Sequence, residues 1–106
     1  MMALQAPPSY MRGFVQSAFV ARTMAAAGSL DVSPTSWYRS VGDNARVGGD
    51  PFSQHLVGWA IDAVGPDQQQ FAKRLRMTGL TVVQEAHHIH FQAFPAGILR
   101  RLLGSP

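Results

Sequence analysis

Residues 53–62 read SQHLVGWAID, and this stretch places a histidine and a carboxylate on either side of a bend. His55 and Asp62 are seven positions apart, and seven extended residues span about 23 Å. The two side chains can therefore serve one ion only if the chain folds back between them. Gly58 is the residue best suited to that bend, because glycine adopts backbone conformations that are closed to other residues.

The other three histidines lie together near the opposite end of the chain, in the run EAHHIHFQ over residues 85–92. On a β-strand His88 and His90 face the same side, about 6.6 Å apart at the backbone, and His87 faces away. A His-x-His pair by itself is more often a surface or packing feature than a metal site. Together with the histidine and carboxylate of residues 53–62 it favours a metal site, because zinc uses imidazole and carboxylate ligands where cysteine is absent.

The composition is typical of a folded protein with short elements. The chain has 106 residues, of which 46% are hydrophobic and 14% charged, with ten glycines and seven prolines. This length predicts one domain over residues 1–106. Residues 1–8 are expected to form a flexible arm, because they end in a pair of prolines and show little periodicity. The formal net charge of +3 comes from basic residues scattered along the chain, which argues against nucleic acid as a partner.

The apolar segments are too short for a membrane protein. None approaches the roughly 18 residues of a membrane span, so we expect a soluble protein. The stretch Met11–Ala27 superficially resembles a signal peptide, but Arg22 interrupts its apolar part. We therefore expect synthesis in the cytoplasm without a secretory signal, and any action outside it would need cell lysis or carriage on a particle.

Turn residues divide the chain into short helices and strands. Ser9 and Asp67 are placed to cap two helices at their N-termini, and Gly28 and Gly79 to end them. The expected elements are a helix from about residue 9 to 27 whose apolar stripe includes Phe14 and Phe19, a strand at 32–38, a structured loop at 40–54, a strand at 58–64, a helix at 67–77, strands at 80–83 and 89–94, and a short closing helix at 96–103. This order predicts an α+β fold with a small antiparallel sheet.

The motif Ser53-x-His55-x-x-Gly58-x-Ala60-x-Asp62 resembles the SxHxxGxAxD signature of the zinc D-Ala-D-Ala carboxypeptidases and the phage L-alanyl-D-glutamate endopeptidases. This superfamily also contains the hedgehog signalling domain. Trp37-Tyr38-Arg39-Ser40 and Asn44-x-x-Val47-Gly48-Gly49 are similar to its YRS and NxxVGG segments, and residues 85–90 to its closing Glu and His-x-His element. The resemblance covers residues 35–94 and implies a zinc peptidase fold with a central antiparallel sheet and flanking helices.

The resemblance also implies a set of zinc ligands. His55 and Asp62 correspond to two of them. Family members with a His-x-His ending use its second histidine, which implies His90 as the third ligand and places His88 beside the open position. Members with Glu-x-x-His use the histidine three positions after the acid, which implies His88. We prefer His90, because Ile89-His90-Phe91 continues the strand pattern, and His88 stays the alternative.

The remaining site residues are assigned by chemistry. Glu85 is the only glutamate and is the expected general base, with His88 as a further catalytic residue beside the metal. Arg39 is expected to stabilise the charge that develops on an amide carbonyl, or to hold a substrate carboxylate. Ser53 is expected to bind the peptide or to support Asp62, and Tyr38 to contact substrate as part of the cleft wall.

Two functions follow as hypotheses. The first is a zinc-dependent peptidase that cleaves a peptidoglycan stem peptide near a D-residue, as a carboxypeptidase or an endopeptidase, at the bacterial cell wall or in the periplasm. The second is a module of the same fold that binds the wall without cutting it, for example as a component of a phage particle. A site closed by four protein ligands, with His88 and His90 both bound, would favour the second.

Overall fold

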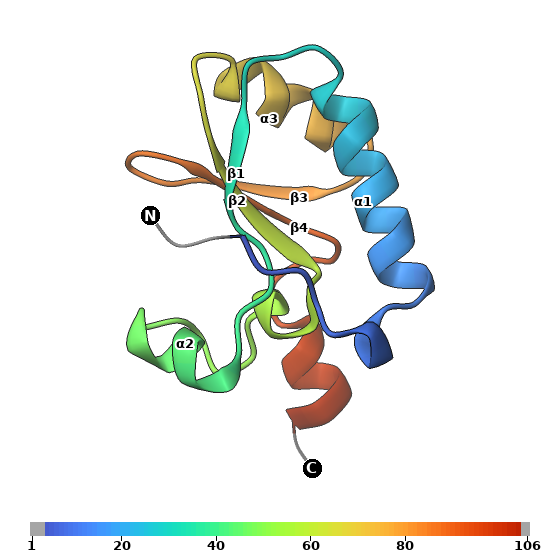
Figure 1. Ribbon diagram of the computed structural model, residues 1–106, viewed down its shortest axis with the longest axis vertical. Helices are drawn as coiled ribbons and strands as arrows, with labels where there is room; N and C mark the ends of the chain where they lie inside the picture. Colours follow the sequence, from blue (N-terminus) through green and yellow to red (C-terminus); the bar gives the residue numbers. More distant parts are fainter. Residues whose placement is uncertain (1–3, 105–106) are drawn as a thin grey trace.

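The computed structural model describes residues 4–104 of the chain. Four strands form one antiparallel sheet in the order β1-β2-β4-β3, and two helices, α1 and α3, pack against one of its faces (Figure 1). The predicted α+β class is therefore confirmed. The elements are α1 Phe14–Ala27, β1 Ser33–Ser36, α2 Val41–Arg46, β2 Ala60–Val64, α3 Gln68–Met77, β3 Thr81–Gln84 and β4 Ile89–Gln92, with 3₁₀ turns at Ser9–Met11 and Gln54–Val57 and a helical turn at Arg100–Gly104.

The pairing of β2 with β4 separates core residues from polar ones. Ile61 pairs with Phe91, and the next pair along the ladder is Asp62 with His90. Because successive side chains of a strand point to opposite faces, Ile61 and Phe91 enter the core beneath the helices. Asp62 and His90 lie on the face that α1 and α3 leave open.

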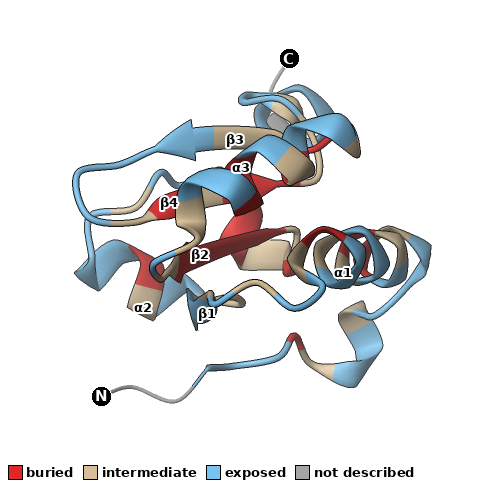
Figure 2. Ribbon diagram, turned by 90° about the horizontal axis from the view of Figure 1, so that it is seen from above, coloured by how far each residue is buried: buried red, intermediate tan, exposed pale blue. Residues whose placement is uncertain are grey.

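The core is built around one aromatic ring of β4. The centroid of the Phe91 ring lies 5.7 Å from that of Phe19 in α1 and 5.4 Å from that of Phe71 in α3. All three rings are buried, and burial of such a side chain stabilises a fold by about 1.5–3 kcal/mol. Figure 2 shows β2 buried over most of its length, and β1 and β4 pair with its two edges, so the strand is held in the middle of the sheet.

Helix α1 begins later than predicted, because a side chain within the helix caps it. Ser9 starts only a 3₁₀ turn, and Arg12 returns the chain to an extended conformation. Gln16 Oε1 accepts a hydrogen bond from the N–H of Gly13 over 2.8 Å, and Gln16 Nε2 donates to the carbonyl of Val57 over 2.9 Å. The helix start is thus set by a contact 41 residues away in sequence.

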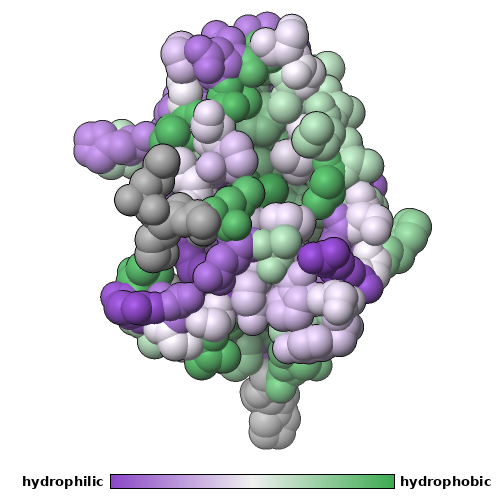
Figure 3. Space-filling view, viewed as in Figure 1, coloured by the Kyte–Doolittle hydropathy of each residue, from purple (hydrophilic) through white to green (hydrophobic). Residues whose placement is uncertain are grey.

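The predicted apolar stripe of α1 is only partly buried. Phe19 is 1% exposed, whereas Phe14 is 88% exposed and Met24 is also exposed. In the view of Figure 1, Figure 3 shows mainly hydrophobic and weakly polar residues over α1, and hydrophilic and hydrophobic residues side by side over α2. Assigning Phe14 to the buried stripe was wrong, because its side chain lies at the surface while Phe19, five positions later, enters the core.

The strands are shorter than predicted where backbone groups find partners outside the sheet. The sequence predicts β1 as far as Tyr38, but the Tyr38 N–H donates to the carbonyl of Gln5 over 3.0 Å. It predicts β4 as far as Phe94, but the Phe94 N–H donates to Gln54 Oε1 over 3.0 Å. Side chains and segments distant in sequence therefore end these strands. The closing helical turn also differs from the predicted range 96–103, since it spans Arg100–Gly104.

Two capping residues behave differently from one another. The predicted loop at 40–54 contains the short helix α2, and Ser40 caps it by accepting a hydrogen bond from the Asp43 N–H over 3.1 Å. Asp67 precedes α3 as predicted, but its carboxylate accepts from the N–H of Asp31 over 2.7 Å instead of capping the helix. Asp67 therefore ties α3 to the chain before β1.

Residues 4–8 of the predicted arm contact the rest of the fold, and residues 1–3 lie outside the described residues. Pro7 is buried against Gly58, where a Cβ atom would lie 2.3 Å from Pro7 Cγ. Gly58 has a φ of 73° and makes the predicted bend. Within residues 4–104 no helix has the length and apolar character to cross a membrane.

Candidate metal centre

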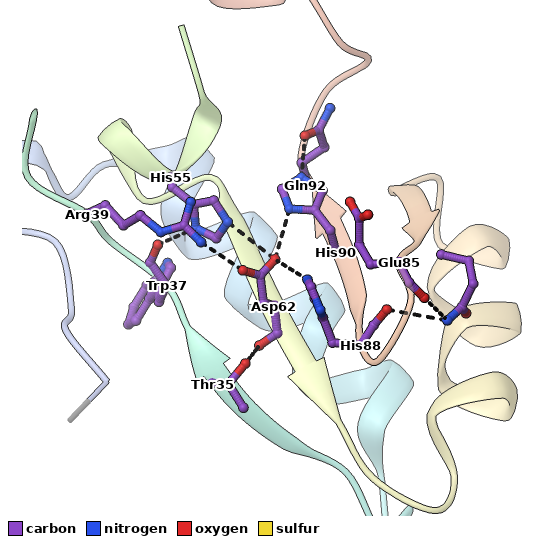
Figure 4. Close-up of polar contacts among 10 residues, drawn as sticks. Thr35, Trp37, Arg39, His55, Asp62, Glu85, His88, His90 and Gln92 are labelled. Carbon is purple, nitrogen blue, oxygen red and sulfur yellow. Dashed lines mark hydrogen bonds and ion pairs between the residues drawn. The ribbon is translucent and has the colours of Figure 1, made fainter. Parts of the chain in front are cut away.

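Three elements bring one side chain each to a common point on the open face of the sheet. His55 comes from the 3₁₀ turn before Gly58, Asp62 from β2 and His90 from β4 (Figure 4). Each offers one ligand atom, and these three atoms lie within 4.8 Å of one another. The bend at Gly58 reverses the chain between His55 and Asp62, so both side chains reach the same place.

The His55 ring is oriented by the chain before α2. It is 1% exposed, and its Nδ1 lies 2.5 Å from the carbonyl oxygen of Trp37. A carbonyl only accepts, so Nδ1 carries the proton and Nε2 presents a lone pair. Nε2 is buried without a hydrogen-bond partner among the described residues and lies 3.4 Å from Asp62 Oδ1. A buried, unpaired imidazole nitrogen of this kind fits a metal ligand.

Asp62 is the centre of the cluster. Its Oδ1 lies 3.0 Å from His90 Nδ1 and 3.8 Å from His88 Nε2, and its Oδ2 accepts a hydrogen bond from Arg39 Nη2 over 2.9 Å. Burial alone would raise the pKa of this carboxyl, but the neighbouring rings of His55 and His90, with the hydrogen bond from His90 Nδ1, outweigh burial and hold the pKa well below its ordinary value. Asp62 is therefore ionised and available as a ligand.

His90 has the opposite shift. Burial would lower the pKa of its ring, but the hydrogen bonds that the ring donates to Asp62 and Gln92, together with the negative charges of Asp62 and Glu85, raise it above its ordinary value. Without a metal, the His90 proton thus supplies the positive charge that Asp62 attracts.

A cavity of about 310 Å³ opens onto this cluster. Its lining includes the predicted residues Arg39, Ser53, Glu85 and His88 as well as the three cluster residues. Glu85 is exposed in the hairpin directly after β3, not at the start of the closing strand, and its N–H donates to the carbonyl of His88 over 2.9 Å. The cavity therefore places a carboxylate, a guanidinium and an imidazole around one point.

The family model for peptidase M15 matches residues 7–92, which contain the whole cluster and all four strands. The chain belongs to the peptidase M15 family. This membership confirms the resemblance to the zinc D-Ala-D-Ala carboxypeptidases that the motif indicates. No curated protein and no solved structure matched the chain.

M15 peptidases are zinc-dependent metallopeptidases, and the cluster fits that metal. Two imidazoles and one carboxylate are a donor set of catalytic zinc sites, in which three protein ligands leave a fourth position open. The unpaired Nε2 of His55 is the clearest sign of the fit. The candidate zinc ligands of this M15 chain are therefore His55, Asp62 and His90.

His88 lies at the edge of the cluster formed by His55, Asp62 and His90. Its side chain is 37% exposed, and its Nε2 is farther from Asp62 Oδ1 than the ligating atoms of His55 and His90 are. This is the placement expected if His90 is the third ligand and His88 stands beside the open position. The choice between the two histidines stays a prediction.

Three other predicted site residues have contacts that the sequence does not reveal. Ser53 Oγ accepts from the His55 N–H over 3.1 Å, so it caps the turn that carries this ligand. Arg39 is bonded to Asp62. Tyr38 lines a separate cavity together with Thr35 and Arg46, so the structure does not bring it to the metal cluster.

Sequence reasoning missed two uncharged residues of the site, Gln54 and Gln92. Both are buried, and Gln92 Oε1 lies 2.6 Å from His90 Nε2. Gln92 follows His90 by two positions, a spacing that places both side chains on one face of a strand. That spacing was a usable signal for Gln92, whereas nothing in the sequence distinguishes Gln54.

Proposed function

We propose that this M15 peptidase is a zinc-dependent peptidoglycan hydrolase that cleaves a stem-peptide amide bond near a D-amino acid. One observation carries the proposal. The three candidate ligands meet beside a cavity that is also lined by a carboxylate, a guanidinium and an imidazole. A bound zinc ion would polarise the substrate carbonyl and lower the pKa of a water molecule. Such a site suits amide hydrolysis at neutral pH.

Glu85 has the position and chemistry of the general base. Its carboxylate lies in the cavity wall, exposed and without a salt bridge among the described residues. It would accept a proton from the attacking water as the C–O bond forms, and deliver that proton to the amide nitrogen as the C–N bond breaks.

Arg39 and His88 supply hydrogen-bond donors for the substrate. A guanidinium carries five N–H donors, and Asp62 accepts a hydrogen bond only from Nη2. The remaining donors of Arg39 can hold a substrate carboxylate or the developing negative charge on the carbonyl oxygen. His88, at the open side of the cluster, is the second donor toward that oxygen.

The substrate is testable with purified peptidoglycan. Zinc-loaded protein is incubated with walls of different stem-peptide composition, and the products are identified by mass spectrometry, with a chelator-treated sample in parallel. Release of a terminal D-residue identifies a carboxypeptidase, and cleavage within the stem identifies an endopeptidase. If no wall gives a zinc-dependent product, the proposed substrate class is wrong.

One observation favours a second candidate function. His88 Nε2 lies only 3.8 Å from Asp62 Oδ1, so a small movement would let it close the site as a fourth ligand, as in structural zinc sites. The protein would then bind the wall, or belong to a phage particle, without cutting. X-ray absorption of the zinc-loaded protein distinguishes the two, since three imidazole ligands indicate the closed site and two indicate the open one.

A further inference from the structure

Two buried glutamines meet at the backbone of Phe94. Gln54 is 4% exposed and Gln92 is 8% exposed. Gln54 Nε2 donates to the Phe94 carbonyl over 2.7 Å, and its Oε1 accepts from the Phe94 N–H over 3.0 Å. Gln92 Nε2 donates to the same carbonyl over 2.9 Å. The chain after β4 is thus anchored to the residue that precedes His55.

This anchor determines which way the Gln92 amide faces. Because its nitrogen donates to Phe94, its oxygen must point to the other side, where it lies 2.6 Å from His90 Nε2. An amide oxygen only accepts hydrogen bonds, so His90 must donate from Nε2. The lone pair of a neutral His90 ring then lies on Nδ1, the atom that is 3.0 Å from Asp62 Oδ1.

The two candidate histidine ligands therefore direct different ring nitrogens at Asp62. In His55 the nitrogen that faces a backbone carbonyl is Nδ1, and Nε2 faces Asp62. In His90 the nitrogen that faces an acceptor is Nε2, and Nδ1 faces Asp62. Each ring thus has one nitrogen on a fixed acceptor and the other directed at the cluster.

We propose that Gln92 is a positioning residue, which holds the proton of His90 on Nε2 so that Nδ1 is the atom presented to the metal. The inference rests on the zinc site of the proposed function. Residues of this kind, which orient a ligand through its other nitrogen, change metal affinity by about 10- to 100-fold when removed. Gln54 contributes indirectly, because it holds the Phe94 carbonyl to which Gln92 donates.

Two substitutions separate this role from a purely structural one. Gln92→Leu removes both the acceptor for His90 and the donor for Phe94, whereas Gln92→Glu keeps an acceptor and loses the donor. Zinc affinity, measured by competition with a chelator, should fall about 10- to 100-fold in Gln92→Leu and stay within about threefold of the parent in Gln92→Glu. Gln69→Leu is the matched control, because Gln69 bonds only Gln84 on the exposed surface.

The proposal fails if both Gln92 variants lose affinity equally, which would indicate a role through Phe94 alone, or if neither loses any. Nuclear magnetic resonance of the zinc-loaded parent gives a test that needs no variant: the His90 proton should be on Nε2 and the metal on Nδ1, and the reverse arrangement overturns the proposal. Both readouts are independent of hydrolysis. A protein that binds zinc as described but cuts no peptide refutes the proposed function alone, and one that binds no zinc refutes both.

Discussion

Asp62 and His90 are direct partners in neighbouring strands, and their side chains meet with Oδ1 3.0 Å from Nδ1. The register of β2 and β4 thus places two candidate ligands side by side without help from any loop. His55 is the third member, and it depends on the bend at Gly58. The cluster therefore combines a rigid pair in the sheet with one ligand held by a turn.

The contact between Asp62 and His90 makes the stability of the metal-free protein depend on pH. The lowered pKa of Asp62 stabilises the folded chain above the ordinary value of 3.8, and this stabilisation is lost as the pH falls toward the folded-state pKa. The raised pKa of His90 stabilises the folded chain below the ordinary value of 6.5, and this is lost as the pH rises through the folded-state pKa.

We therefore expect the metal-free protein to be most stable between about pH 4 and pH 6.5. Thermal melting in the presence of a chelator measures this, with His90→Gln as the control whose profile should be flatter above neutral pH. Zinc binding should show the opposite trend and strengthen as the pH rises, because the metal competes with the His90 proton. A metal-free melting temperature that climbs steadily into alkaline pH would contradict the assignment.

Replacing Glu85 by Gln should separate chemistry from structure. The amide keeps the shape of the side chain but cannot accept the proton of water, so hydrolysis should fall by about 10² to 10⁴. Glu85 is exposed and outside the candidate ligand set, so the melting temperature and zinc content should match those of the parent. Metal analysis and turnover are measured on the same preparation, and parental turnover with full zinc would place the base elsewhere.

The two histidines of the closing element should respond differently to truncation. His90→Ala removes a candidate ligand and should abolish zinc binding at micromolar concentrations. His88→Ala should keep zinc, because its Nε2 lies outside the three-residue cluster, and should lower kcat by removing a donor beside the substrate. Equal loss of zinc in both variants would show that the site uses four protein ligands.

The sequence revealed the cluster more completely than it revealed the supports around it. His55, Asp62 and His90 are detectable because their residue types are rare and their spacing has a chemical meaning. Helix α2 escaped prediction because a helix of six residues has too little periodicity to stand out from a loop. The start of α1 could not be placed, because Gln16 takes its partners from Gly13 and from Val57 far along the chain.

The same limit applies to side chains with several plausible partners. Asp67 has the residue type and position of a helix cap, yet its carboxylate accepts a hydrogen bond from the Asp31 N–H and not from the helix. Tyr38 is adjacent to Arg39 in the motif, but neighbouring residues of an extended chain point in opposite directions, and only Arg39 lines the metal cavity. Local sequence therefore identified the chemical groups, and tertiary contacts decided which of them face the site.

Gly58→Ala should damage both the fold and the metal site, and the chain offers a precise control. Gly58 and Gly48 share a φ of 73°, but a Cβ at Gly58 would lie 2.3 Å from Pro7 Cγ, whereas a Cβ at Gly48 would meet no atom within 4 Å. Both alanine variants bear the cost of a left-handed backbone, about 1–2 kcal/mol. Only Gly58→Ala adds a steric clash, which costs about 1–3 kcal/mol more.

Because Gly58 carries the bend between two candidate ligands, Gly58→Ala should also weaken zinc binding, while Gly48→Ala should leave zinc affinity unchanged. Denaturant unfolding of the metal-free proteins measures the first effect, and chelator competition measures the second. Adding Pro7→Ala to Gly58→Ala removes the clashing Cγ and should restore part of the lost stability, since the two residues are in contact and their effects are not additive. If the two glycine variants are destabilised equally, or if Pro7→Ala only adds to the loss, then Pro7 does not hold the ligand turn in place.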